Sequence, residues 1–338
     1  MKKTNGPKKP TRNDVAKLAG VSSAVVSYVL NDMDCVSDDK RKAVWAAVEQ
    51  LGYYPNVSAR ALRTNKTFQI ALVCENILYN EWLYNIENIL FEKQYYVSMC
   101  HSQPTGSFLQ MIAQRQYDAI YLMSNYFNEQ QLNGLADSGV PIILFKTKAY
   151  DQPLGPGIAT VAPLYEDGVK KIINYLSLKG HKRIGYIPTL RYGIHGLSGN
   201  DFRMRGYVEA MELNGLPLDE RLVCMNTASL ETICDSIFNM LSLSPSERPT
   251  ALAVMNDYLA AQVMKYLKQL GIRVPEDIAI TGMDNANVAS ITSPALTTVD
   301  FSKSEFAKHV SHGLISLIRG ENVGDIYLPM RLVIGESA

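Results

Sequence analysis

The fold of the amino-terminal part is decided by residues 11–62, which read TRNDVAKLAGVSSAVVSYVLNDMDCVSDDKRKAVWAAVEQLGYYPNVSARAL. Thr11, followed three residues later by Asp14, is a variant of the capping box with which helices begin. Gly20 can adopt the left-handed backbone conformation with which helices often end. These signals predict a short first helix with a small apolar face.

A second helix is predicted from about Ser23 to Leu30, with Ser22 as its cap. Val26, Val29 and Leu30 recur at the spacing of a single helix face, so we expect them to be buried. The outer face is then left to Ser23, Ala24, Ser27 and Tyr28. Two helices joined by three or four residues around a glycine form a helix-turn-helix, whose second helix fits the major groove of DNA.

A third helix is predicted from the hydroxyl and the two acids at 37–39 to Leu51, with Gly52 ending it. Pro55 suits the first turn of a fourth, very short helix. About nine residues are too few for a stable isolated helix in water, so this one is expected to fold mainly when paired on DNA. Spacing alone leaves open a small three-helix unit that binds no ligand.

Beyond spacing, the segments NDVAKLAGVSSAVVSYVLN, VSDDKRKAV, LGYYPN and SARAL closely resemble the DNA-binding domain of the lactose-repressor (LacI/GalR) family of regulators. The resemblance implies that residues 55–66 are a hinge helix and linker, which orders on the operator. It further implies that Leu62 enters the minor groove, where an apolar wedge unstacks a base step and bends the duplex. The alternative for Leu62 is simple packing between hinge helices or onto the next domain.

The DNA contacts are accordingly predicted at Thr11, Ser22, Ser23, Ala24, Val25, Ser27, Tyr28, Asn31, Asn56, Ala59, Leu62 and Arg63. Val25 and Tyr28 stand where many relatives carry Thr and Arg. The missing Arg removes a bidentate partner for guanine, whereas Tyr28 can exchange one hydrogen bond and touch a thymine methyl. We therefore expect a base-reading surface that is light on charge.

The formal net charge is zero, but it is unevenly distributed. Residues 1–66 hold 12 Lys and Arg against 6 Asp and Glu, and the remaining residues hold 21 against 27. A basic head on an acidic body is the asymmetry expected of a nucleic-acid binder. The tail at 1–10 is expected to be disordered; contact with phosphates and an inert role are both open.

The rest of the composition favours a cytoplasmic protein. The tail lacks the apolar run of a secretion signal, and no run of 18 apolar residues predicts a membrane span. The cysteines form no CxxC pair, which is typical of a reduced compartment. They are Cys35, Cys74, Cys100, Cys224 and Cys234.

Residues 67–338 alternate short apolar runs with helical stretches, as in FQIALVC, YYVSMC, AIYLM, PIILF, RIGYIP, ALAVM and IAITGM. This alternation predicts α/β structure with parallel sheets and helices on both faces. This part of the chain is longer than a domain with a single hydrophobic core usually is, so two lobes are expected. The first is assigned to about 67–179 and 302–328, and the second to about 180–301 and 329–338. The family resemblance implies a periplasmic-binding-protein-like body that binds an effector between the lobes.

The segments that carry this second resemblance are EDGVKKIINYLSLKGHKRIGYI, FRMRGYVEAM, PTALAVMNDYLAAQVMKYLKQLGIRVPEDIAITGMDN and SPALTTV. They imply an effector site at Tyr79, Asp167, Arg203, Asn256, Asp284 and Phe301. Carboxylate, amide and guanidinium groups at strand ends suit a sugar, whose hydroxyls both donate and accept hydrogen bonds. The alternatives are a helix cap for Asp167, a surface role for Arg203 and turn-shaping roles for Asn256 and Asp284. Phe301 either stacks on a sugar or marks a ligand that is not a sugar.

Nothing in the sequence predicts an enzyme, a cofactor or a metal site. His309 and His312 share a helix face but lack a third ligand, and the segment GLSG is not a nucleophile elbow. We expect a homodimeric, effector-responsive repressor that binds a pseudo-palindromic operator, because paired helix-turn-helices require paired half-sites. A solute-binding protein with no DNA role and a regulator that answers to a protein partner are the alternatives.

Overall fold

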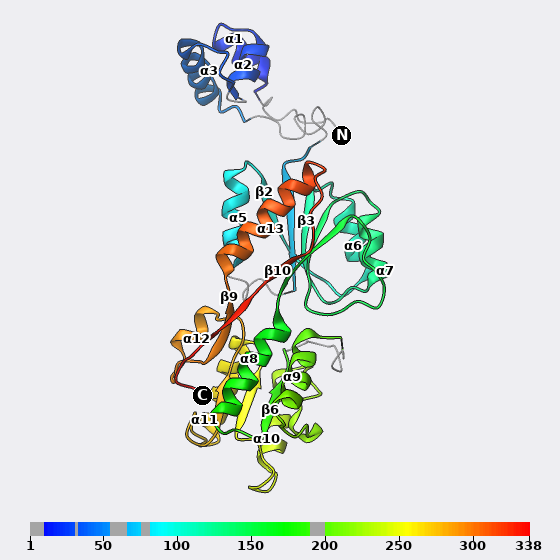
Figure 1. Ribbon diagram of the computed structural model, residues 1–338. Helices are drawn as coiled ribbons and strands as arrows, with labels where there is room; N and C mark the ends of the chain where they lie inside the picture. Colours follow the sequence, from blue (N-terminus) through cyan, green and yellow to red (C-terminus); the bar gives the residue numbers. More distant parts are fainter. Residues whose placement is uncertain (1–9, 31–32, 55–65, 76–81, 190–199) are drawn as a thin grey trace, which may run out of the picture. The chain divides into compact units, whose positions relative to one another are not determined.

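The computed structural model describes residues 10–30, 33–54, 66–75, 82–189 and 200–338 (Figure 1). The chain divides into two compact units, Met1–Thr67 and Phe68–Ala338.

The first unit contains three helices, α1 (Arg12–Leu18), α2 (Ser23–Leu30) and α3 (Asp38–Leu51). Thr11 caps α1 in a reciprocal capping box with Asp14, as the sequence predicts. The helices surround a small core made of Val15, Ala16, Val26, Val29, Val36, Val44 and Ala47. These seven small side chains make a core of modest size. The outer surface of α2 is not covered by the rest of the described unit.

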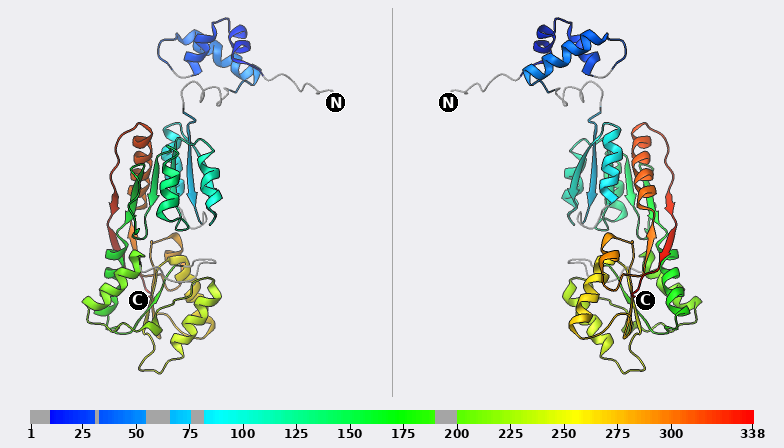
Figure 2. Two further views of the ribbon diagram at one scale, coloured as in Figure 1. Left: turned by 90° about the vertical axis from the view of Figure 1, so that its right-hand side faces the viewer. Right: turned by 90° about the vertical axis from the view of Figure 1, so that its left-hand side faces the viewer.

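The second unit begins with a six-stranded sheet in the order β10-β5-β4-β3-β1-β2, in which every neighbouring pair is parallel. Its strands are β1 (Gln69–Cys74), β2 (Tyr96–His101), β3 (Ala119–Met123), β4 (Ile142–Phe145), β5 (Ile158–Pro163) and β10 (Ile326–Leu328). Helices cover both faces, as Figures 1 and 2 show: α5 (Trp82–Glu92) and α13 (Lys303–Ile318) on one, α6 (Gly106–Ala113) and α7 (Glu129–Ala136) on the other.

Alternate strand residues pack into two separate layers, which is the expected period of two. In β1, Ile70 and Leu72 join the core beneath α5 and α13, whereas Ala71 and Val73 join the core beneath α6 and α7. The central strands β1, β3, β4 and β5 are therefore buried on both faces, which explains their nearly continuous apolar sequences, whereas the edge strand β2 is partly exposed.

The second lobe is built on the parallel sheet β6-β7-β8, with β6 at Ile184–Ile187, β7 at Ala251–Val254 and β8 at Ala279–Thr281. An antiparallel pair, β9 (Thr298–Phe301) with β11 (Met330–Val333), adjoins it. The remaining elements are α8 (Tyr165–Leu178), α9 (Phe202–Leu213), η1 (Glu220–Leu222), α10 (Leu230–Leu241), α11 (Asp257–Gln269) and α12 (Asn287–Ile291).

The lobe boundary differs from the expected one at residue 179. Helix α8 lies in the second lobe, where it packs against α9 and β11 (Figure 1). The approach to α9 is close, because a Cβ on Gly206 would lie 2.8 Å from the Cα of Glu166. The chain therefore passes to the second lobe directly after β5, and it crosses twice more, between β9 and α13 and between β10 and β11.

Candidate functional site

Helix α2 presents the candidate DNA-reading surface. Its first turn is capped by Ser22, whose Oγ accepts a hydrogen bond from the Val25 amide at 3.3 Å. Val26 and Val29 are buried in the core, whereas Ala24 is exposed and Tyr28 is 43% exposed. The predicted burial is thus confirmed for Val26 and Val29, whereas Leu30 is only partly buried against the same core. The outward residues offer a phenol and a methyl group to a groove and no charge.

The other predicted DNA contacts fall into two groups. Thr11 is exposed, but its hydroxyl donates to Asp14 Oδ2 at 2.7 Å and is engaged in capping. Ser23 and Ser27 are partly exposed, and Val25 packs partly against the core, so Val25 has less surface to offer than Ala24. Five predicted contacts lie outside the described residues: Asn31, Asn56, Ala59, Leu62 and Arg63.

In the second unit, the guanidinium of Arg203 is the centre of a buried polar cluster. Arg203 lies in the first turn of α9 and is 6% exposed. Its Nε donates to Asp201 Oδ1 at 3.1 Å and its Nη2 to Asp201 Oδ2 at 2.9 Å, so the two side chains form a fork-shaped ion pair. The guanidinium carbon also lies 5.0 Å from the centre of the Tyr165 ring.

Asn256 and Asp284 come from the ends of β7 and β8 and meet at this cluster. Asn256 Nδ2 donates to Asp284 Oδ2 at 3.4 Å, while Asn256 Oδ1 caps α11 by accepting from the Leu259 amide. Asp284 is 8% exposed, and its Oδ1 has no hydrogen-bond partner among the described residues. Burial raises the pKa of Asp284, and the positive charges of Arg203 and Lys303 oppose that rise.

Asp257 holds in place the turn after β8 that carries Asp284. Its carboxylate accepts hydrogen bonds from the Thr298 hydroxyl and the Ala286 amide, both at 2.7 Å. Burial is the main reason that the pKa of Asp257 is raised to about 8, and the charge of Asp284 adds to the rise. The ammonium of Lys303 donates to the carbonyl of Asn285, next to Asp284.

The facing side is a row of polar groups at the carboxyl ends of β1 to β4. Ser102 donates to Ser124 at 3.0 Å, and Thr147 donates to Asn125 Oδ1 at 2.8 Å. Glu75 accepts a hydrogen bond from the Asn125 amide. In open parallel sheets, ligands bind at this edge.

A backbone bridge joins this row to the Arg203 cluster. Lys148 pairs with Asp201 in an antiparallel bridge, flanked by hydrogen bonds from Ala149 N to Asn200 O at 2.8 Å and from Phe202 N to Thr147 O at 3.1 Å. The segment after β4 in one lobe thus holds the start of α9 in the other.

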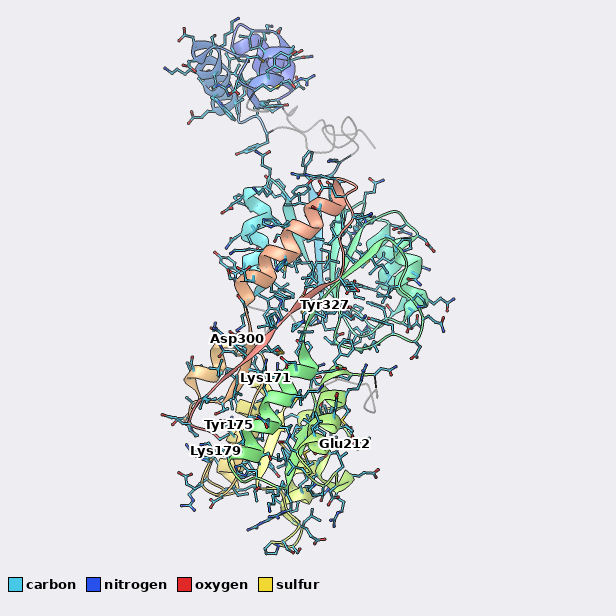
Figure 3. All side chains as sticks on the ribbon, in the orientation of Figure 1. Lys171, Tyr175, Lys179, Glu212, Asp300 and Tyr327 are labelled. Atoms are coloured by element: carbon cyan, nitrogen blue, oxygen red, sulfur yellow. The ribbon has the colours of Figure 1, made fainter. Side chains whose placement is uncertain are left out.

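Of the six predicted effector residues, Arg203, Asn256 and Asp284 are brought together. Asp167 is on α8 with its side chain 46% exposed, and it accepts from Lys171 Nζ at 2.5 Å (Figure 3 labels Lys171). It is therefore paired with Lys171 on the exposed face of α8 and, among the described residues, is not part of the Arg203 cluster. Tyr79 lies outside the described residues.

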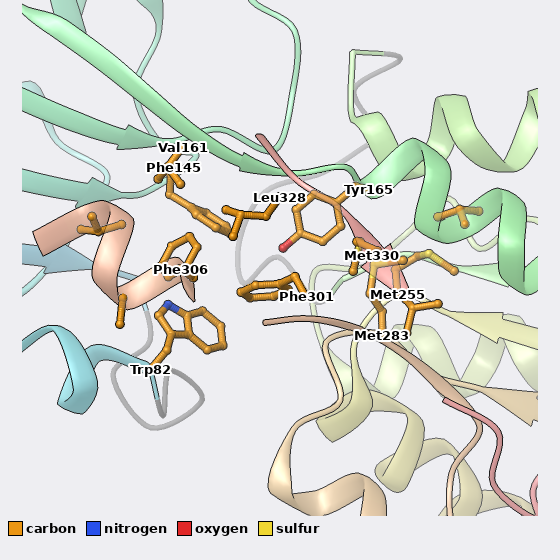
Figure 4. Packing of buried hydrophobic residues seen from close by; sticks show 14 of the residues in the cluster. Trp82, Phe145, Val161, Tyr165, Met255, Met283, Phe301, Phe306, Leu328 and Met330 are labelled. Atoms are coloured by element: carbon orange, nitrogen blue, oxygen red, sulfur yellow. The ribbon is translucent and has the colours of Figure 1, made fainter. Parts of the chain in front are cut away.

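Phe301 is 0% exposed and belongs to an aromatic core, so no face of its ring is open to a ligand in this structure. Figure 4 shows it between Trp82, Phe306 and Tyr165. Its ring centre lies 5.6 Å from that of Trp82 and 5.5 Å from that of Phe306, in edge-to-face arrangements. Of the two alternatives for Phe301, stacking on a sugar therefore does not fit this structure, because the ring packs against Trp82 and Phe306 at the joint between the lobes.

Sequence reasoning missed Asp201 and Tyr165. The available signal for Asp201 was its position two residues before Arg203, at the start of a predicted helix. The same Asp-x-Arg spacing recurs at Asp219 and Arg221, where the pair is exposed and distant from this cluster. Spacing alone therefore could not tell a buried pair from a surface pair.

Within the part of the chain that the structure describes, no three His, Cys, Asp or Glu side chains come together as ligands for a metal ion. No helix among these residues has both the length and the apolar character to cross a bilayer.

Comparison with known proteins places the chain in a family. Residues 11–56 match bacterial regulatory proteins of the lacI family, and residues 173–338 match a periplasmic binding protein-like domain. The transcriptional repressor PurR of Photorhabdus laumondii is 30% identical over 333 residues, covering 96% of this chain and 95% of its own. PurR of Yersinia pestis (biovar Antiqua) is 30% identical over 297 residues, covering 86% and 84%.

Solved structures agree in fold over nearly the whole length. The lac repressor dimer bound to operator and the anti-inducer ONPF has a TM-score of 0.80 at 23% identity and covers 98% of this chain and 99% of its own. The complex of the regulator CelR with cellobiose has a TM-score of 0.68 at 25% identity and covers 97% and 100%. With its helix-turn-helix and two-lobed α/β body, this chain belongs to the lacI family of bacterial regulatory proteins and is a DNA-binding transcriptional regulator.

Proposed function

We propose that this chain is a homodimeric repressor whose affinity for a pseudo-palindromic operator is controlled by a small molecule bound at Arg203, Asn256 and Asp284. The observation that carries the effector site is the unpartnered, buried Oδ1 of Asp284 beside a guanidinium and an amide. A buried polar atom without a partner is costly, and a ligand hydroxyl or amine would satisfy it.

The outward surface of α2 supports the DNA part of the proposal. Ala24 and Tyr28 project from a helix whose buried side is already satisfied by the core. Tyr28 reads base edges, the basic residues of the head hold phosphates, and Leu62 of the hinge wedges the minor groove. Relatives named as repressors, and a relative crystallised as a dimer on its operator, support the sign of regulation and the stoichiometry.

Control passes through the joint between the lobes. Arg203 begins α9, and the residues just before it are bridged to the segment after β4. A ligand that pairs with Arg203 and Asp284 therefore bears on the bridge that sets the lobe arrangement. A coupling free energy of about 1–3 kcal/mol would change operator affinity roughly 5–150-fold. The complex of a relative with cellobiose supports a sugar or a similar metabolite as the effector.

The groups of the cluster are assigned to binding, and no catalytic step is assigned to them. The relatives are transcriptional regulators, and this supports a role in the cytoplasm, where the operator is.

The test combines two measurements on the full chain. A selection from random duplexes, followed by fluorescence anisotropy across a salt series, should yield one preferred sequence with two-fold symmetry and a steep negative salt slope. A thermal-shift screen of sugars and nucleosides should then find a ligand that changes the measured operator affinity. Absence of any duplex preference would refute the DNA role. A ligand that binds without changing operator affinity would instead refute the control.

A further inference from the structure

The guanidinium of Arg203 is already occupied. Asp201 fills its Nε–Nη2 edge with two hydrogen bonds of 3.1 and 2.9 Å, and both side chains are at most 7% exposed. An arginine commonly takes a carboxylate or a phosphate through a two-pronged edge of this kind. Here the Nε–Nη2 edge of Arg203 already binds the Asp201 carboxylate, which also neutralises its positive charge.

Asp201 is held firmly in this position. Its carboxylate caps α9 by accepting from the Arg203 amide at 2.9 Å. Its backbone forms the antiparallel bridge with Lys148, and the bonds on either side of it join Asn200 to Ala149 and Phe202 to Thr147. A ligand anion could not displace Asp201 without breaking the cap and disturbing the bridge.

Among the residues that the structure describes, the charges around the site leave no excess for an anion. Arg203 and Lys303 are the cations that act on Asp284, and Asp201 and Asp284 are the carboxylates that offset them. Asp257, whose pKa burial raises to about 8, adds little negative charge at neutral pH. Lys303 is itself bound to the carbonyl of Asn285. Among the described residues, the Oδ1 of Asp284 is a buried acceptor of this cluster without a hydrogen-bond partner, and it requires a donor from the ligand.

We propose that Asp201 determines the specificity of the effector site: it matches the charge of Arg203, so that the site takes an uncharged ligand bearing hydroxyl or amino donors and excludes carboxylates and phosphates. This rests on the proposed function only in placing the effector at Arg203 and Asp284. A phosphate here would add negative charge beside two carboxylates in a buried setting, where like charges repel strongly.

Removing the charge of Asp201 should reverse the selectivity. In Asp201→Asn the guanidinium keeps a hydrogen-bond partner but loses its counter-charge, and a buried cation without a counter-charge favours an anion. Asp201→Ser is the second variant, because serine also caps helices well and so protects α9. Asp219→Asn is the matched control, since Asp219 makes the same i, i+2 pair with Arg221 on the exposed surface.

The experiment titrates inorganic phosphate, against chloride at equal ionic strength, and follows thermal stability and isothermal titration heats of the full chain. The wild type and Asp219→Asn should not differ in their response to phosphate. At least one Asp201 variant should bind phosphate about tenfold or more tightly than the wild type, because the Coulomb attraction is no longer offset. Adding Arg203→Gln to that variant should abolish the gain.

Three results would overturn the proposal: saturable phosphate binding by the wild type that Arg203→Gln removes, Asp201 variants that bind phosphate no better than the wild type, or a gain that survives Arg203→Gln. If neither single variant folds, a screen of the wild type with sugars and their uronic acids or phosphates decides. A charged member that binds more tightly than its neutral parent contradicts the proposal, and so does a screen in which no neutral member binds. Operator binding is measured separately, so failure of the repressor function is seen there without affecting the phosphate result.

Discussion

Gly282 lies directly against the carboxylate of Asp257, so closely that a Cβ on residue 282 would overlap the Oδ1 atom. The contact forces glycine at the end of β8, and it keeps Asp257 where it can bind Thr298 and the Ala286 amide. The turn that carries Asp284 thus rests on a contact that tolerates no side chain.

Replacing this glycine should be strongly destabilising. Gly282→Ala should lower the free energy of unfolding by about 2 kcal/mol or more, because overpacking and loss of two buried hydrogen bonds act together. Gly134→Ala is the control. It lies in α7 with no atom within 4 Å of the added Cβ, and helical Gly→Ala should be neutral or stabilise by about 0.5–1 kcal/mol. Urea unfolding measures both, and equal effects would contradict the contact.

The same acid predicts a pH dependence of stability. The pKa of Asp257 is near 3.8 when unfolded and is raised to about 8 in the fold, so between these values the folded state binds more protons. Stability should therefore fall as pH rises from about 4 to 8, with a slope of at most about 1.4 kcal/mol per pH unit from this group. Burial causes most of this rise in the pKa; the charge of Asp284 adds to it, whereas Thr298, the Ala286 amide and Lys303 oppose it.

Asp257→Asn should remove that part of the slope, because amide and protonated acid carry the same charge. Urea unfolding of the variant and the wild type at several pH values gives the difference. A wild-type slope that the variant retains in full would show that Asp257 does not titrate in this range.

The structure gives Asp284 and Asp167, both predicted to bind the effector, very different surroundings. Asp284→Asn should weaken effector binding about tenfold or more, since the Oδ1 acceptor is the open position of the cluster and charged hydrogen bonds are the stronger ones. Asp167→Asn should have little effect, because Asp167 is half exposed and paired with Lys171. Calorimetry on both variants is decisive, and a larger loss for Asp167→Asn would reverse the assignment.

On α2, the phenol of Tyr28 should contribute to sequence preference more than to salt dependence. Tyr28→Ala should cost roughly 1–3 kcal/mol of discrimination at one base pair and leave the salt slope unchanged, since the side chain is uncharged. Tyr28→Phe separates the hydroxyl from the ring. Anisotropy on the selected operator and its single-base variants measures this, and a flat profile would remove Tyr28 from the base-reading set.

A structural feature could be predicted from the sequence where the residues that determine it are neighbours along the chain. The capping box of Thr11 and Asp14, the buried Val26 and Val29, and the alternating strands are local, and they were predictable. The position of α8 could not be predicted, because the apolar face of an amphipathic helix shows that it packs against a core but does not show which lobe supplies that core. Asp201 and Phe301 required the fold, since their partners come from distant residues such as Trp82.

The central proposal is that a ligand bound at the Arg203–Asp284 cluster changes the affinity of the DNA-binding head for its operator. The most direct measurement is operator affinity by anisotropy, with and without the ligand found by thermal shift, for the wild type and Asp284→Asn. We expect a ligand-dependent change in operator affinity of about 5–150-fold in the wild type that is lost in Asp284→Asn, with ligand-free operator affinity retained. An equal ligand response in both proteins would contradict it.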